Sequence, residues 1–86
     1  MSLTERVFKA LANRRRLAIV KLLKQRPRVA VGDIANHLKV SMPTASKHIA
    51  ILAAADIVEY ERQSLTVFYS LTDNPTIMLR DILKHI

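Results

Sequence analysis

The fold is decided by the stretch Ser41-Met42-Pro43-Thr44-Ala45-Ser46-Lys47-His48-Ile49. Ser41 is a favoured helix N-cap residue, because its side-chain oxygen can accept a hydrogen bond from the first turn. Pro43 falls in that first turn, where its missing amide hydrogen costs no intrahelical hydrogen bond. The pattern predicts a helix from Ser41 to Ala54. Its inward apolar stripe is expected to consist of Ala45, Ile49, Leu52 and Ala53.

A shorter helix is predicted just before this one. It is opened by Gly32 and Asp33 and ends near Leu38. Only two residues, Lys39 and Val40, separate it from the longer helix. Two short helices joined by a tight turn are typical of a helix-turn-helix motif.

The periodicity of the apolar residues changes from helical to alternating near Ile57. Alternation over two β-rich runs, separated by the short segment Gln63-Ser64-Leu65, predicts a β-hairpin. A hairpin directly after the second helix of a helix-turn-helix makes the motif winged. In the first run Val58, Tyr60 and Arg62 alternate with Glu59 and Glu61, and in the second Val67, Tyr69 and Leu71 alternate with Thr66, Phe68 and Ser70.

Two helices are predicted ahead of this motif. The first begins at a capping box formed by Ser2 and Glu5 and runs to about Ala12. The second is capped by Asn13, covers about Arg14–Lys24, and ends before Pro27.

The rest of the chain adds a short extended piece, Val29–Val31, and a last helix after a turn at Asp73-Asn74-Pro75. We therefore expect a mainly α fold with a small β-hairpin, a winged helix-turn-helix, as a single domain over residues 1–86. The expected order is helix, helix, short extended piece, helix, helix, strand, strand, helix. The last helix carries Ile77, Leu79, Ile82, Leu83 and Ile86.

The composition excludes several classes of protein. The chain has no cysteine, which rules out disulfides, thiolate zinc sites and a cysteine nucleophile. It has one glycine, and therefore no Gly-rich phosphate loop, so we expect neither an enzyme nor a cofactor. No apolar run reaches the length of a membrane span, and the first residues do not resemble a signal peptide. We expect a soluble, cytoplasmic protein with no membrane partner.

The charge of the chain favours a polyanionic partner. Fourteen Lys and Arg against seven Asp and Glu give +7, and on a compact domain such basicity most often indicates nucleic acid. The charge is uneven, because residues 1–28 hold nine basic and one acidic residue, or +8, whereas residues 53–86 carry −2. The cluster Arg14, Arg15 and Arg16 thus precedes the predicted motif, and its role stays open between phosphate contact and a solvated helix start.

The predicted motif suits double-stranded DNA. Hydroxyls and a lysine on the outward face of the 41–54 helix can reach phosphates and base edges in the major groove. Two alternatives stay open, since Lys47 can be merely solvated and His48 can be a partly buried helix residue. The candidate DNA-binding residues are Ser41, Met42, Thr44, Ser46, Lys47 and His48 in the helix and Arg62, Gln63 and Ser64 in the hairpin.

Several segments also resemble one known family. Residues 11–20, Leu-Ala-Asn-Arg-Arg-Arg-Leu-Ala-Ile-Val, look like the opening motif of arsenic-repressor-type (ArsR/SmtB) winged-helix repressors. Residues 31–35, 41–52 and 67–71 are similar to three further motifs of that family, the 41–52 segment most specifically. The resemblance implies a homodimeric transcriptional regulator, with the first and last helices building the dimer and the Ser41–Ala54 helix reading a palindromic operator.

The chain departs from this family at several positions. Its residues 29–34 lack the cysteines that the metal sensors carry there. In the last helix only Asp81 and His85 correspond to possible metal ligands, and two ligands per chain suffice at best for a site bridging a dimer; the alternative is a charge-compatible helix end. Met42 stands where the family commonly has Gln, and the hairpin tip lacks the usual Gly-Arg.

The sequence leaves two hypotheses for the function. The first is a sequence-specific dimeric repressor that competes with polymerase for its operator. The second is a non-specific or architectural DNA-binding protein, driven by basic charge alone. If the last helix forms the dimer interface, a charged residue in place of Leu79 or Leu83 is expected to dissociate the dimer.

Overall fold

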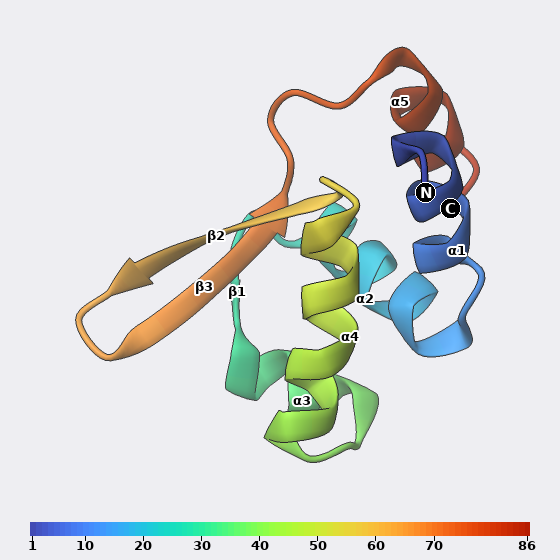
Figure 1. Ribbon diagram of the computed structural model, residues 1–86. Helices are drawn as coiled ribbons and strands as arrows, with labels where there is room; N and C mark the ends of the chain where they lie inside the picture. Colours follow the sequence, from blue (N-terminus) through green and yellow to red (C-terminus); the bar gives the residue numbers. More distant parts are fainter.

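The computed structural model describes all 86 residues and confirms the predicted order of helices and strands. In Figure 1 the β2–β3 hairpin projects away from the helices, and both termini lie on the opposite side of the molecule. None of the helices is both long and apolar enough to cross a bilayer. The elements are α1 (Leu3–Leu11), α2 (Arg14–Gln25), β1 (Val29–Ala30), α3 (Val31–Leu38), α4 (Met42–Ala54), β2 (Val58–Gln63), β3 (Thr66–Leu71) and α5 (Ile77–Leu83).

The predicted helix caps are present. Ser2 and Glu5 form the capping box of α1, with the Glu5 amide donating to the Ser2 hydroxyl over 3.2 Å. The Asn13 side chain accepts from the amides of Arg15 and Arg16 at 3.0 and 3.1 Å. Each cap satisfies amide groups that the first turn of a helix leaves without a partner. Local sequence therefore determines where these helices begin.

The ends of several elements differ by a residue or more from the prediction. Helix α1 ends at Leu11, because Ala12 leaves helical geometry before Asn13 takes the extended conformation of a cap. Helix α3 begins at Val31, before the predicted Gly32–Asp33 start, since only Val29 and Ala30 pair in the sheet. Helix α5 ends at Leu83, short of the last apolar residue in its pattern.

The strands form one antiparallel sheet in the order β1-β3-β2. Val29 and Ala30 of β1 pair with Tyr69 and Phe68 of β3. The predicted hairpin turn is a two-residue loop, Ser64-Leu65, closed by the pair Gln63 and Thr66. Ser64 has a φ of 58°, the left-handed conformation that reverses the chain here without a glycine.

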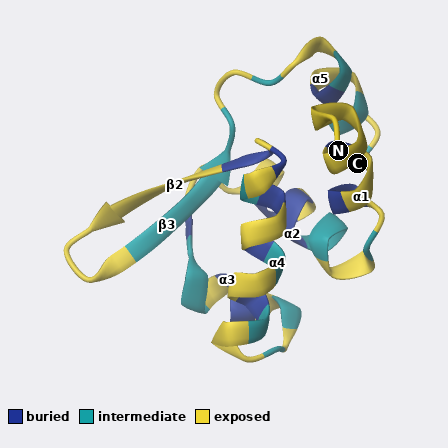
Figure 2. Cartoon of the chain, in the orientation of Figure 1, coloured by how far each residue is buried: buried dark blue, intermediate teal, exposed yellow.

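The alternating pattern of the hairpin does not correspond to a buried face along its whole length. In β2 only Val58, at the base, is buried, and Tyr60 is 69% exposed. The rings of Tyr60 and Tyr69 lie 6.2 Å apart across the strands. Figure 2 shows β2 exposed beyond its first residue, whereas β3 is half-buried from Val67 to Leu71. Most of β2 and the tip of the wing are therefore available to a partner.

The core is entirely apolar, and no polar or charged side chain is buried. From α4 it takes the predicted stripe residues Ala45, Ile49 and Leu52, whereas Ala53 is only half-buried. From α5 it takes Leu79, which is 2% exposed. Leu79 therefore belongs to the core of the monomer, and a charge there would disrupt that core before it could report on a dimer contact.

Candidate nucleic-acid interface

Helix α4 begins with a rigid cap. The Ser41 hydroxyl accepts a hydrogen bond from the Thr44 amide at 3.2 Å and donates to the Thr44 hydroxyl at 3.0 Å. Pro43 occupies the first turn, as expected. Both hydroxyls thus fix the direction of the helix N-terminus, where the remaining amides and the helix dipole favour a phosphate.

Three predicted residues of α4 are exposed together near its beginning. Met42, Ser46 and Lys47 are exposed, whereas Ala45 and Ile49 of the inward stripe are buried. Lys47 has no acidic partner, because the only ion pair in the structure joins Lys84 and Asp81. The helix therefore presents a thioether, a hydroxyl and an unpaired ammonium group to solvent.

His48 is placed differently from these residues. It is half-buried, and its Nδ1 lies 3.2 Å from Nη1 of Arg16. A guanidinium can only donate, so Nδ1 accepts and Nε2 carries the ring proton. Burial first, and then the positive charges of Arg16 and Arg15, lower the pKa of His48 below its ordinary value of 6.5. At neutral pH this imidazole is uncharged.

Arg16, from the basic cluster whose role the sequence left open, makes structural contacts. Its Nε donates to the Ala10 carbonyl at 2.6 Å, and its Nη2 donates to the Lys9 carbonyl at 3.1 Å. These carbonyls belong to the last turn of α1, which has no intrahelical donors for them. One guanidinium thus joins the end of α1, the start of α2 and the middle of α4. Within the basic cluster Arg14 and Arg15 are exposed, whereas Arg16 is half-buried.

The wing carries the other predicted residues. Arg62, Gln63 and Ser64 are exposed at its far end, next to Leu65, which is 95% exposed. A second arginine, Arg28, also lies against the wing, a position that the sequence did not predict. The guanidinium of Arg28 lies over the Phe68 ring, 4.4 Å from its centroid. A cation stacked on an aromatic face in this way adds positive charge to the root of the wing.

The structure gathers no group of three or more His, Cys, Asp or Glu side chains that could hold a metal ion. Asp81 instead lies 3.7 Å from the ammonium group of Lys84. The His85 amide donates to the Ile82 carbonyl, continuing the chain as a turn after α5. Within one chain, these two residues are therefore part of a helix end.

Comparison with known proteins identifies relatives of one kind. A family model described as a helix-turn-helix domain matches residues 11–61. The chain is 39% identical over 72 residues to the transcriptional repressor SdpR of Bacillus subtilis, covering 84% of this chain and 77% of SdpR. It is 30% identical over 80 residues to the transcriptional activator HlyU of Vibrio cholerae, covering 93% and 73%.

Solved structures agree with these relatives. A homodimeric winged helix-turn-helix DNA-binding domain of a possible ArsR-family regulator from Mycobacterium bovis superposes with a TM-score of 0.82 at 31% identity. The match covers 96% of this chain and 73% of that one. HlyU from Vibrio cholerae also gives 0.82, at 28% identity, covering 96% and 86%.

Proposed function

Because this chain belongs to the ArsR/SmtB family of winged helix-turn-helix transcriptional regulators, we propose that it binds a palindromic operator as a homodimer. The observation that carries the proposal is the exposed group Met42, Ser46 and Lys47 at the rigidly capped start of α4. A helix end of this shape fits the major groove, with its first turns against base edges and phosphates.

Each predicted residue has a role in this proposal that matches its surroundings. Ser46 and Lys47 contact bases or phosphates. Met42 offers an apolar contact at the position where a glutamine would form two hydrogen bonds to an adenine. Ser41 and Thr44 orient the helix N-terminus toward a phosphate. His48 acts mainly through Arg16, as a neutral partner that holds α4 against α1 and α2. The wing residues Arg62, Gln63 and Ser64 contact the neighbouring minor groove or backbone.

The proposed dimer uses the first and last helices. Phe8 on α1 is 55% exposed, and Ile77 on α5 is 79% exposed, which is unusual for side chains of this size. Covering them with a second copy would remove apolar area from water. Twofold symmetry would place two α4 helices in successive major grooves, about 34–36 Å apart. The homodimeric state of the Mycobacterium bovis relative supports a dimer as such.

We propose repression as the outcome, by occlusion of polymerase. The repressor SdpR shares more identity with this chain, 39%, than the activator HlyU does at 30%. An architectural function is the second candidate, favoured by the charge of +7. Against it, most of that charge lies in residues 1–28 and little lies in α4.

Selection of bound fragments from a random DNA pool, followed by binding assays at physiological salt, tests the proposal. A repressor should prefer one inverted repeat over random DNA by about a thousandfold or more. Equal affinity for all sequences, with a steep dependence on salt, would support the architectural function instead.

A further inference from the structure

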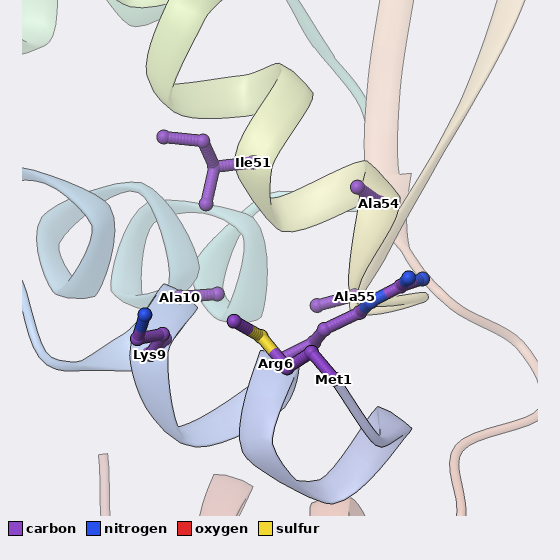
Figure 3. A pocket seen from close by; sticks show the side chains of 7 residues that line it. All are labelled: Met1, Arg6, Lys9, Ala10, Ile51, Ala54 and Ala55. Carbon is purple, nitrogen blue, oxygen red and sulfur yellow. The ribbon is translucent and has the colours of Figure 1, made fainter.

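An open groove of about 260 Å³ lies between α1 and the C-terminal half of α4. Figure 3 shows the two cationic residues of the groove, Arg6 and Lys9, beside an apolar lining. No acidic side chain lines it. The apolar lining consists of Met1 and Ala10 from the α1 side and Ile51, Ala54 and Ala55 from the α4 side.

The positive charge beside the groove is not neutralised within the chain. The only ion pair in the structure joins Lys84 and Asp81, so neither Arg6 nor Lys9 has a carboxylate partner. A third cation, Arg16, lies near the end of α1, where it donates to the backbone carbonyl of Lys9. Clustered cations next to an apolar surface raise the local concentration of anions. The groove is thus complementary to a molecule with an apolar body and a negative end.

The groove lies on a different side of α1 from the proposed dimer contact. Arg6, Lys9 and Ala10 are three and four residues apart and share one helix face. Phe8 is two residues from both Arg6 and Ala10, so it points elsewhere. A second copy that covers Phe8 therefore need not fill the groove.

We propose that the groove binds a small amphipathic carboxylate, and that its occupancy weakens operator binding. An apolar cavity of about 150 Å³ holds one benzene ring, so 260 Å³ suits roughly ten non-hydrogen atoms. The apolar body packs on Ile51 and Ala54, and the carboxylate pairs with Arg6 or Lys9. The regulatory part of this inference rests on the proposed DNA-binding function, whereas the binding site does not.

The coupling to DNA follows from the position of the groove on α4. Lys47, a proposed DNA contact, lies four residues before Ile51, one turn along the same face. On the other wall, the Ala10 carbonyl accepts from Arg16, which contacts His48. An occupant between α1 and α4 changes how the reading helix sits relative to the dimer helices. If the occupant binds more tightly to another conformation than to the operator-bound one, it shifts the chain toward that other conformation. Operator binding is then weakened.

Octanoate is a suitable probe, because its chain and carboxylate match the expected size and charge. Titration of the 86-residue chain, followed by calorimetry and by amide chemical shifts, should show saturable binding with shifts at the groove residues. Octan-1-ol should bind about tenfold more weakly, and octylamine should not bind. Arg6→Gln with Lys9→Gln should reduce octanoate affinity about tenfold or more. Ala54→Leu, which fills the groove, should abolish binding, whereas Lys21→Gln on α2 should change nothing.

Several results would overturn the site. They are the absence of saturation up to the solubility limit of octanoate, equal binding of octylamine, and shifts confined to Phe8 and Ile77. A loss of operator affinity in the Arg6 and Lys9 variant without octanoate would show that these cations serve DNA instead.

Measuring operator affinity and octanoate affinity separately, and then together, distinguishes a failure of this inference from a failure of the proposed function. Operator affinity is measured first without octanoate, and failure there contradicts the proposed function while leaving octanoate binding to be judged by calorimetry. If the chain binds both operator and octanoate, octanoate should lower operator affinity. Operator should then lower octanoate affinity by the same factor. Simultaneous binding with both affinities unchanged would overturn the regulatory part.

Discussion

Nη1 of Arg16 lies 3.2 Å from Nδ1 of His48, and this contact joins the first turn of α2 to the middle of α4. The same guanidinium closes the last turn of α1 through the carbonyls of Lys9 and Ala10. Arg16 thus adds polar contacts to the apolar packing of Ala45, Ile49 and Leu52 that holds α4 against the rest of the fold.

Replacing Arg16 should therefore cost more stability than replacing its neighbours. Arg16→Ala removes three hydrogen bonds and leaves two carbonyls without their donors, which should lower the free energy of unfolding by about 2–4 kcal/mol. Urea unfolding measures this. The matched control Arg15→Ala, at an exposed position, should change stability by less than about 0.5 kcal/mol. Equal stability of the two variants would contradict the structural role of Arg16.

Stability should fall as the solution is acidified through the range in which His48 titrates. Its pKa is lowered in the folded state, so the unfolded chain binds the proton more readily. The contribution of neutral His48 to the free energy of unfolding is constant above about pH 6.5, the pKa of histidine in the unfolded chain. It is lost as the pH falls from there toward the pKa of His48 in the folded state. Urea unfolding between about pH 7.5 and pH 5 should show this loss, and His48→Gln should reduce it. An unchanged slope in His48→Gln would show that other groups cause it.

Lys47 should contribute to DNA binding without contributing to the fold. Lys47→Ala should weaken operator binding by about 1–3 kcal/mol if the ammonium group reads a guanine, and specificity should relax at that base pair. If it contacts only a phosphate, the loss should be uniform across sequences, with a smaller salt dependence. Fluorescence anisotropy on labelled duplexes measures both. Lys21→Ala on α2 is the control and should bind as the wild type does.

Two residues of α5 should respond in opposite ways to the same substitution. Ile77→Glu places a carboxylate on an exposed position in the first helical turn, where it suits the helix dipole. The fold should persist while dimer affinity falls about tenfold or more. Leu79→Glu should instead unfold the chain, because it buries a charge in the core.

Sedimentation equilibrium and circular dichroism distinguish these outcomes. Leu65→Glu, at the exposed wing tip, is the control and should stay folded and dimeric. If Ile77→Glu also remains fully dimeric, α5 is not part of the interface.

Most of the fold was predictable because it depends on short-range chemistry. Ser41, Asn13 and the pair Ser2 and Glu5 cap their helices through bonds to residues at most three positions away. Such bonds can be read from sequence, because the helix itself places the partners. The apolar stripe of α4 followed from helical periodicity in the same way.

The contacts that organise the site were not predictable, since tertiary packing creates them. Arg16 and His48 are 32 residues apart, and the Lys24 ammonium group binds the Leu83 carbonyl 59 residues away. The exposure of the wing was also hidden, because Tyr60 alternates with charged residues whether or not anything covers it. Periodicity identifies a face, but only the packed structure shows what lies against that face.

The central claim, that two α4 helices read one palindromic site together, is tested most directly by changing the spacing of that site. The selected inverted repeat is compared with a version in which about five base pairs, half a helical turn, are inserted between the half-sites. We predict that the insertion reduces affinity to that of a single half-site, because the two helices then face opposite sides of the duplex. Equal affinity for the two spacings would contradict a dimer that reads both half-sites.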